Sequence, residues 1–281
     1  MTLTPSEAAR LLAAYGLTPS RALGQNFVVD PNTVRRIARL AAVGPADQVV
    51  EVGAGLGSLT LALAETGASV TAVEIDRHVL PILREVLAER APEVRVVEGD
   101  AMALDWQEVL GGALSWVLVA NLPYNVATPL VLDLLDDVPA IDRMLVMVQR
   151  EAGERLVAAP GSRAYGIPSV KVAYHAIAEI VGTVGPNVFL PKPRVESALV
   201  SIRRRQAPAV DGDPERLFAL VRAGFGQRRK MLRRSLAALV GAADLEAAGV
   251  DPQARAEDLD IDAWGRLARL PQPPPPSRSR V

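Results

Sequence analysis

The chain has 281 residues, which leaves room for one large domain with a smaller one, or for two modest domains, and excludes a single small module. Hydrophobic residues make up 49% of the chain and charged residues 22%, so there is enough apolar surface for a core, and global disorder is excluded. The formal net charge of −1 does not by itself predict a nucleic-acid partner, and the absence of cysteine excludes disulfide scaffolds, thiolate metal sites and cysteine nucleophiles.

Metal and membrane partners are not expected either. The two histidines leave few ligands for a zinc site and little for a Ser-His-Asp triad. No apolar run approaches the roughly 20 residues that a membrane-spanning helix needs. The first residues carry neither a basic patch nor an apolar stretch long enough for export, so we expect a cytosolic protein.

The hydrophobic pattern changes along the chain. Residues 1–46 are predicted to be helical and irregular, with a helix over 31–40 that begins at a proline. Short apolar strands then alternate with helices, which predicts an α/β fold with a parallel sheet covered on both faces. The predicted strands are 48–52, 69–73, 94–97, 115–119, 144–149 and 198–203, and two of the helices between them are 59–64 and 79–89.

Composition also suggests domain boundaries. The stretch 206–214 is rich in Pro, Gly and Asp and is predicted to be a linker. Residues 215–270 show only helical periodicity, which predicts a small helical domain after a larger domain of residues 1–205. The Pro-rich residues 271–281 cannot pack a core and are expected to be disordered.

A glycine-rich loop follows the first strand of the predicted sheet. Residues 53–58 allow the backbone to approach a ligand at a helix N-terminus, but Ser58 stands where the dinucleotide fingerprint requires glycine, which disfavours NAD. Glu74, Asp100 and Asn121 follow at intervals that match a strand-helix unit. All of them should therefore project from one edge of the sheet, where open α/β sheets bind ligands, although each acid could instead cap a helix.

The tetrapeptide Asn121-Leu122-Pro123-Tyr124 ends the fourth strand. Alone it could be a plain turn, but at the ligand edge it offers a mechanism. The exocyclic amine of adenine is a poor nucleophile because its lone pair is delocalised. The amide oxygen of Asn121 and the carbonyl of Leu122 could each accept one N–H and favour a pyramidal nitrogen, while Tyr124 stacks on the base and Pro123 stiffens the loop. Catalysis would then rest on positioning.

A local excess of positive charge lies towards the C-terminus. Residues 186–235 contain twelve basic and four acidic residues, a net charge of +8. Such a field suits phosphate backbones, and an equally reasonable interpretation is a solvated, arginine-rich helix. Charge alone does not decide between them.

Several motifs together resemble one enzyme family. They are the glycine loop, Glu74, 99–101 and 121–125, joined by 23–27, 189–198, 225–230 and 249–252. In these segments the chain resembles the S-adenosylmethionine-dependent N6-adenine methyltransferases of RNA, specifically the KsgA-type small-subunit rRNA adenine dimethyltransferases. The resemblance covers residues 15–270. It implies a Rossmann-like methyltransferase sheet with a smaller C-terminal helical domain.

The resemblance also implies roles for single residues. In the cofactor site, Glu74 would hold the ribose of S-adenosylmethionine and Asp100 its adenine amine. The other implied cofactor contacts are Gln25 and Asn26 at the methionine end, the main chain at Val28, Gly53, Gly55 and Asn121. The target adenine would be held by Asn121, Leu122, Pro123 and Tyr124. Phe189 would cover its other face, although a buried structural anchor is an equally good interpretation of Phe189.

The implied substrate is a pair of neighbouring adenosines in the hairpin loop near the 3′ end of small-subunit rRNA, each dimethylated. Loop bases are easily unstacked, which suits an enzyme that must extract its base. We expect a monomer that docks on the small ribosomal subunit through basic residues of the helical domain. These residues are Arg228, Arg229, Lys230, Arg233 and Arg234.

Two other interpretations stay open at this point. One is a binding module of the same shape, an assembly or transcription factor with a vestigial loop, against which the intact 121–124 tetrapeptide argues. The other is an NAD-linked oxidoreductase, which would want an acid or base at the sheet edge. We expect His78 on the helix after the second strand and His175 in a later strand, so neither histidine suits that role.

Overall fold

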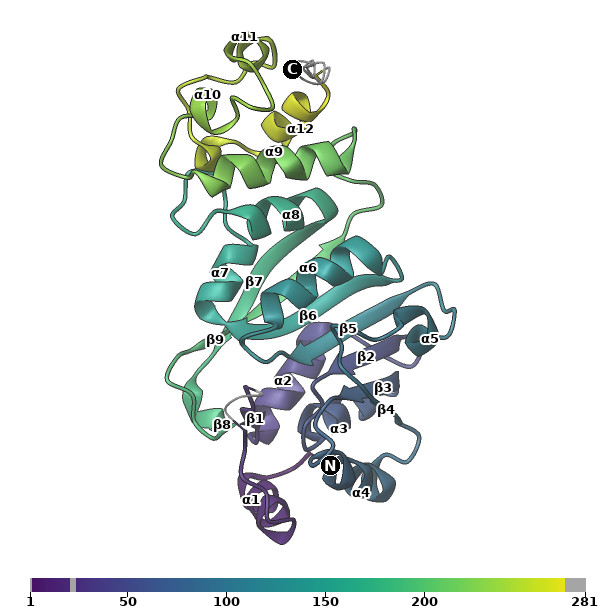
Figure 1. Ribbon diagram of the computed structural model, residues 1–281. Coiled ribbons are helices and arrows are strands. Elements are labelled where there is room, and N and C mark those ends of the chain that lie inside the picture. Colours follow the sequence, from purple (N-terminus) through teal and green to yellow (C-terminus); the bar gives the residue numbers. More distant parts are fainter. Residues whose placement is uncertain (1, 21–23, 271–281) are drawn as a thin grey trace, which may run out of the picture. The chain divides into compact units, whose positions relative to one another are not determined.

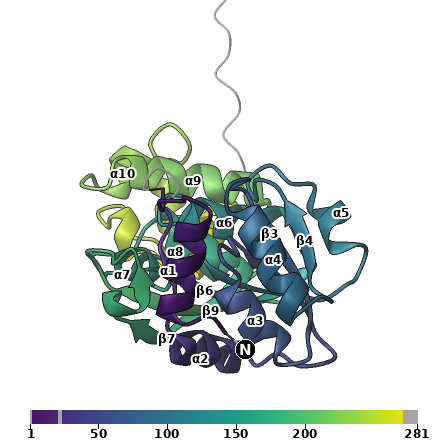
Figure 2. The ribbon, with the colours of Figure 1, turned by 90° about the horizontal axis from the view of Figure 1, so that it is seen from below.

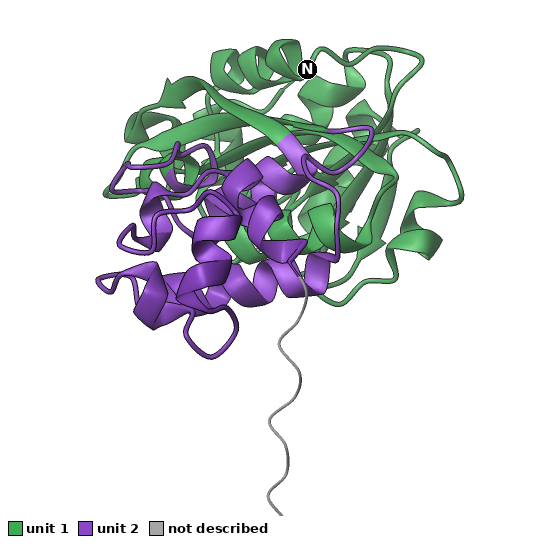
Figure 3. Ribbon diagram, turned by 90° about the horizontal axis from the view of Figure 1, so that it is seen from above, with its two compact units in different colours: residues 1–154, 177–204 green, residues 155–176, 205–281 purple. Residues whose placement is uncertain are grey.

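The computed structural model describes residues 2–20 and 24–270. It divides into two compact units, coloured separately in Figure 3. The first consists of residues 1–154 and 177–204, and the second of residues 155–176 and 205–281. The predicted disorder of residues 271–281 lies outside the described residues.

The first unit is built on a seven-stranded sheet, shown in Figure 1. Its strand order is β4-β3-β2-β5-β6-β9-β7. Strands β2 to β6 pair in parallel, and β9 pairs antiparallel with β6. The bounds are β2 Gln48–Val52, β3 Ser69–Glu74, β4 Arg95–Glu98, β5 Trp116–Asn121, β6 Ile141–Gln149, β7 Ala176–Val184 and β9 Ser197–Arg204.

Helices cover both faces of this sheet, as the sequence predicts. Figure 2 shows α2 and α3 on one face and α6 on the other. The helix α2 begins after Asp30, whose carboxylate accepts the Thr33 N–H at 2.8 Å and so caps the helix. The helix bounds are α1 Pro5–Ala14, α2 Pro31–Ala41, α3 Ser58–Ala64, α4 Leu80–Arg90, α5 Trp106–Leu110, α6 Ala127–Asp137 and α7 Arg150–Leu156.

The order of the strands fixes where a ligand can bind. From β2 the chain moves through β3 to β4 on one side, and then returns to β5 on the other side of β2. The carboxyl ends of β2 and β5 therefore flank a topological switch point, where open α/β sheets leave a crevice. The register of β2 with β3 pairs Val52 with Val73, which places Gly53 beside Glu74.

A short second sheet joins two distant segments of the first unit. Strand β1 (Phe27–Val28) pairs antiparallel with β8 (Phe189–Leu190), which follows the 3₁₀ turn η1 (Pro186–Val188). All of β1 and Phe189 belong to the buried core cluster. Neither strand is predicted from the sequence, because two-residue strands carry no detectable periodicity.

The second unit is helical around its own apolar core. Trp264, Leu217 and Tyr165 lie in this core, and the Tyr165 hydroxyl donates to the Leu259 carbonyl at 2.8 Å. The helices are α8 Ile167–His175, α9 Pro214–Gly226, α10 Leu232–Ser235, α11 Ala242–Ala247 and α12 Ile261–Ala268, with the 3₁₀ turn η2 at Ala256–Asp258.

The domain boundary differs from the one that the sequence suggested. Residues 155–176, placed by sequence in the domain of residues 1–205, group with the C-terminal helices. The reason is packing, since Tyr165, Val170 and Tyr174 lie in the core of the second unit. The expected linker at 206–214 also falls within that unit.

Candidate active site

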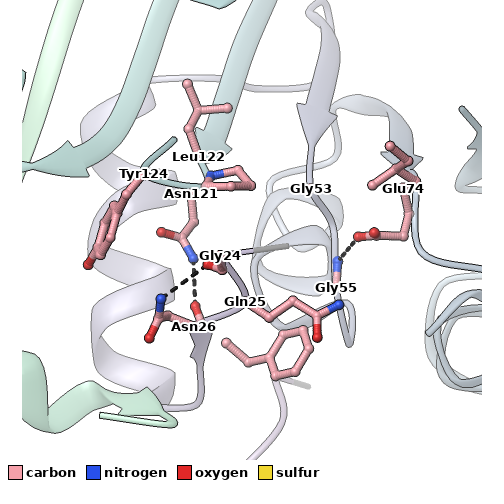
Figure 4. Close-up of a pocket in the computed structure, with 12 residues that line it drawn as sticks. Gly24, Gln25, Asn26, Gly53, Gly55, Glu74, Asn121, Leu122 and Tyr124 are labelled. Carbon is pink, nitrogen blue, oxygen red and sulfur yellow. Dashed lines mark hydrogen bonds between the residues drawn. The ribbon is translucent and has the colours of Figure 1, made fainter. Parts of the chain in front are cut away.

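A pocket opens at the carboxyl ends of β2, β3 and β5, at the switch point of the sheet (Figure 4). It brings together most of the residues that the sequence singled out. Its lining includes Gln25, Asn26, Gly53, Gly55, Glu74, Asn121, Leu122, Pro123 and Tyr124. These residues therefore meet at one edge of the sheet, as their spacing predicts, although they lie far apart in the chain.

The glycine loop brings backbone, rather than side chains, to the pocket. Gly53 and Gly55 have φ angles of +74° and +57°, a conformation that L side chains rarely adopt. A Cβ atom on Gly55 would lie 2.8 Å from a ring carbon of Phe27. Only glycine fits at position 55. The Gly55 N–H donates to the Glu74 carboxylate, with 2.7 Å between the nitrogen and the oxygen.

Glu74 ends β3 with its side chain buried, at 6% exposure. One carboxylate oxygen accepts the Gly55 N–H and the other accepts the Asp76 N–H at 2.9 Å. Burial raises the pKa of the Glu74 carboxyl, and these two hydrogen bonds act in the opposite direction. Each oxygen retains a further lone pair, so the predicted ribose contact is chemically compatible with this geometry.

A second pocket shares Gly53, Ile75 and Pro123 with the first. It is lined by Asp100 and by Met102, whose N–H donates to the Asp100 carboxylate at 2.9 Å. The exposed side chains of Ile75 and Met102 give it two apolar surfaces beside an acid. A flat heteroaromatic ring with an amine matches this combination.

The amide of Asn121 is held in one orientation. Its Nδ2 donates to the main-chain carbonyl of Asn26 at 2.9 Å, as the dashed line in Figure 4 marks. The amide oxygen is therefore the atom that Asn121 offers as an acceptor for another group. The Leu122 side chain is buried at 1% exposure, so Leu122 serves the pocket through its main chain.

Tyr124 is anchored through its hydroxyl. That group shares a hydrogen bond of 3.1 Å with the hydroxyl of Ser197, which is completely buried at the start of β9. Pro123 begins the turn into α6, since its carbonyl accepts the N–H groups of Val126 and Ala127 at 3.1 Å. The loop is therefore fixed at both ends.

Two predicted site residues are not exposed to the pocket that Tyr124 lines. Phe189 is 4% exposed and lies in the core, paired with Val28 across β1 and β8. For Phe189 the structure therefore favours the buried anchor over a stacking partner for the base. Val28 is also buried, and it lines a smaller adjoining pocket beside Gly53 and Asn121.

The two histidines lie elsewhere than the sequence suggested. His78 lies in the turn before α4 rather than on the helix, and its N–H donates to Asp76. His175 is the last residue of α8 and was wrongly expected in a strand. The α8 helix runs directly into β7, without an intervening turn residue to mark the change.

The basic residues of the second unit differ in their environment. The Arg228 guanidinium binds Glu257 at 2.7 Å and the carbonyl of Arg163 at 2.9 Å. Arg229, Lys230, Arg233 and Arg234 are exposed. Arg228 therefore ties segments of its own unit together, and the other four present their charge to solvent.

Four residues that shape the site had no role assigned from the sequence, although Phe27 and Ser197 lie in the segments 23–27 and 189–198 that carry the family resemblance. Phe27 and Ile75 line the main pocket, and Asp76 and Ser197 hold residues that do. Asp76 carried a signal of its own, as a second acid just beyond a strand end, and Ile75 carried none. The contacts of Phe27 and Ser197 depend on pairing between distant strands, which a single sequence does not reveal.

Comparison with known proteins identifies the family. The sequence pattern of the family described as ribosomal RNA adenine dimethylase matches residues 17–272. The chain belongs to this family. A relative from Thermobifida fusca, named ribosomal RNA small subunit methyltransferase A, is 50% identical over 95% of this chain and 95% of its own length. A relative of the same name from Cutibacterium acnes is 51% identical over 95% and 93%.

Solved structures agree with this dimethylase fold. A dimethyladenosine transferase from Plasmodium falciparum superposes with a TM-score of 0.73 at 22% identity, over 85% of this chain and 94% of that one. The 23S rRNA methyltransferase ErmE superposes with a TM-score of 0.67 at 29% identity, over 86% and 98%. The expected Rossmann-like methyltransferase fold is confirmed, and the interpretations as a binding module or an NAD-linked oxidoreductase are wrong.

Family membership makes this chain an S-adenosylmethionine-dependent methyltransferase. The residues present fit that cofactor. The glycine loop leaves no space for a side chain at Gly55, the buried Glu74 carboxylate suits a ribose diol, and the pocket at Asp100 suits an adenine ring. The individual contacts of Gln25, Asn26, Val28, Gly53, Gly55, Glu74, Asp100 and Asn121 stay predictions.

None of the described helices is both long and apolar enough to cross a bilayer. Among the residues that the structure describes, no three His, Cys, Asp or Glu side chains gather in a way that could hold a metal ion.

Proposed function

We propose that this enzyme transfers methyl groups to N6 of two adjacent adenosines in the 3′-terminal hairpin loop of small-subunit rRNA, giving N6,N6-dimethyladenosines. Relatives named small-subunit methyltransferases support the substrate, at about 50% identity over nearly the whole chain. The family description supports dimethylation of adenine. The product would be a mark made during ribosome biogenesis in the cytosol.

The orientation of the Asn121 amide is the observation that carries the proposed chemistry. With Nδ2 bound to the Asn26 carbonyl, the amide oxygen can accept one N–H of the target amine. The carbonyl of Leu122 accepts the other, which favours a nitrogen whose lone pair is out of conjugation with the ring. Tyr124 stacks on the base, and the Ser197 contact fixes its ring.

The cofactor, when bound, supplies an electrophilic methyl group on a sulfonium. The chain contributes binding and alignment. The Glu74 carboxylate and the glycine loop hold one end of the pocket, and the 121–124 loop holds the base at the other. Methyl transfer requires no strong base, because the amine proton becomes acidic once the nitrogen carries the new methyl group.

Docking on RNA would use the exposed basic side chains of the second unit. Arg229, Lys230, Arg233 and Arg234 supply four positive charges within six residues. Each phosphate contact releases condensed counterions, so we expect binding that weakens as salt rises. We propose that one chain acts alone, which light scattering of the purified protein would test.

The decisive experiment maps methylated nucleosides after reaction. Unmodified small subunits are incubated with the enzyme and S-adenosylmethionine, and the rRNA is digested and analysed by mass spectrometry. We expect dimethyladenosine at two adjacent positions with the parent enzyme. Asn121→Ala should reduce the rate by about 100-fold or more, the size of effect typical of losing a group that stabilises the transition state.

A matched control is Asn32→Ala, the same substitution at an exposed position of α2. It should methylate at the parent rate. An Asn121→Ala enzyme that matches the parent, or methyl groups found only at other nucleotides, would overturn the proposal.

A further inference from the structure

Residues 24–27 bridge two sides of the cofactor pocket. On one side, the Asn26 carbonyl accepts the Asn121 amide. On the other, the Gln25 side chain donates from Nε2 to the Asp76 carboxylate at 2.6 Å. This short segment therefore joins the catalytic loop, residues 121–124 after β5, to the turn after β3. Figure 4 shows Gln25 and Asn26 with the contact to Asn121.

The segment packs directly on the catalytic loop. Gly24 has a φ of +64°, and a Cβ atom there would lie 3.2 Å from both the Cβ of Pro123 and the Oδ1 of Asn125. The Asn26 amide also donates to the Gly24 carbonyl at 3.1 Å. Small displacements of residue 25 will therefore be transmitted to the Asn26 carbonyl, because residues 24 and 26 are held closely on either side.

The polar atoms of Gln25 are both engaged within the protein. Its Oε1 accepts the Ser20 N–H at 2.7 Å, and its Nε2 donates to Asp76. This amide thus has a fixed orientation, with its donor end on Asp76. Gln25 also lines the cofactor pocket, and the contact at the methionine end that the family resemblance implies for it stays a prediction.

Asp76 is placed to hold that contact. Its second carboxylate oxygen accepts the N–H of His78 at 2.9 Å, and its own N–H donates to Glu74. One oxygen therefore fixes the Asp76 side chain in the turn before α4, and the other is directed at Gln25. The acid is half-buried and lies next to the pocket without lining it.

We propose that Asp76 is a positioning residue for methyl transfer, which holds Gln25 and, through it, the Asn26 carbonyl that orients the Asn121 amide. Without this contact the Asn121 amide can turn over and present its NH₂ group to the target amine, where two donors repel. The chemical step then slows while RNA docking is unchanged. The kinetic form of this inference rests on the proposed function.

A swap of polarity tests the contact with nearly isosteric side chains. In Asp76→Asn, Oδ1 can still accept the His78 N–H, but an NH₂ group faces Gln25 Nε2. In Gln25→Glu, a carboxylate oxygen faces the Asp76 carboxylate. Each single variant therefore lacks the hydrogen bond. The double variant restores it in reverse, because the new amide at position 76 donates to the new carboxylate at position 25.

We expect each single variant to lower kcat about tenfold, with KM for small subunits within twofold of the parent. The double variant should recover to within threefold of the parent kcat. Full kcat in both single variants, or a double variant no better than the singles, would overturn the proposal. Thermal unfolding of all three should stay near the parent, since the turn before α4 is retained.

Two further measurements separate this inference from its alternatives. If Gln25 instead binds the cofactor directly, calorimetry with S-adenosylhomocysteine will show an affinity loss in Gln25→Glu that the second substitution does not restore, which contradicts the proposal. Hydrogen exchange over residues 24–28 needs no RNA substrate. Faster exchange in the single variants and restored protection in the double variant support the contact even if the parent fails to methylate small subunits, and unchanged exchange refutes it.

Discussion

Ser197 is bound to Tyr124 by a single hydrogen bond between their hydroxyls, so we expect it to act on the target base through the tyrosine ring. Removing either hydroxyl frees the tyrosine ring to rotate and tilt. A hydrogen bond of this kind contributes about 1 kcal/mol, so we expect Ser197→Ala and Tyr124→Phe each to lower kcat/KM about fivefold. The double variant should be no worse than either single variant, because the same interaction is removed in all three. Additive losses in a double-mutant cycle with rRNA substrate would contradict this coupling.

We expect Glu51 to give the stability of the protein an unusual pH dependence. Burial raises the pKa of its carboxyl to about 8, and the Thr60 hydroxyl, which donates to it at 2.5 Å, offsets only part of this rise. The folded pKa lies above the unfolded value of about 4.3, so folding favours the neutral acid. Its contribution is fully present below pH 4 and is lost as pH rises from there through 8.

We expect Glu51→Gln to remove this dependence while keeping an acceptor for Thr60. Urea unfolding of the cofactor-free protein should show the variant more stable than the parent at pH 8, by on the order of a few kcal/mol, and equal to it near pH 4. A constant difference between the two proteins across this pH range would show that Glu51 does not titrate as inferred.

Some single residues could be placed from the sequence and others could not. Glu74 and Asn121 were placed correctly at the pocket edge, because strand ends of a parallel sheet meet at one edge whatever the loops do. Phe189 was ambiguous because its burial depends on pairing with Val28, 161 residues away. Arg228 carries the same charge as Arg229, and only its contact with Glu257 separates their roles.

At the scale of elements, the alternation of strands and helices was predicted well where turns separate them. The predicted strands 48–52 and 144–149 fall within β2 and β6. β7 was missed as an element because α8 leads into it without Gly, Pro or Asn, and its alternation includes Ala and Gly. The hydrophobic periodicity of a segment predicts whether it is a helix or a strand, but it does not show which strands pair.

Arg204 at the end of β9 stabilises another element, the helix α6. Its guanidinium donates to the carbonyls of Leu134, Leu135 and Val138 at 2.8 to 3.1 Å, and to Ile141 at 3.0 Å. The first three lie at the C-terminal end of α6, where the Leu134 carbonyl also accepts the Val138 N–H at 3.1 Å, whereas the Leu135 carbonyl has no such donor because residue 139 is proline. Arg204 therefore caps the helix from a neighbouring strand.

We expect Arg204→Met to lower the free energy of unfolding by about 2–3 kcal/mol, because hydrogen bonds to a charged group are removed and the Leu135 carbonyl loses its donor. Arg203→Met, at the exposed neighbouring position, is the matched control and should cost far less. Urea denaturation followed by circular dichroism measures both. Equal losses in the two variants would contradict the capping role.

At the scale of the whole molecule, the overall charge and the local charge lead to different expectations. The chain is almost neutral, yet residues 186–235 carry a net charge of +8. Part of this charge serves the fold, since Arg204 caps α6, Arg205 donates to the Ala173 carbonyl and Arg228 binds Glu257. The sequence predicted the amount of charge but not which part faces solvent, because that depends on tertiary contacts.

Basic residues that face solvent and basic residues that hold the fold should respond differently to substitution. Replacing both Arg229 and Lys230 with Glu removes exposed charge, so we expect weaker rRNA binding and a flatter dependence of log K on log salt. The slope should fall by about one unit for each phosphate that the protein no longer neutralises.

Arg228→Ala removes the hydrogen bonds to Glu257 and the Arg163 carbonyl. It should lower the melting temperature and leave the salt slope nearly unchanged. Filter binding at several salt concentrations and thermal unfolding give the two readouts, with S-adenosylhomocysteine affinity constant in both proteins. A slope that falls equally in Arg228→Ala, or stays unchanged in the Arg229 and Lys230 variant, would contradict this assignment.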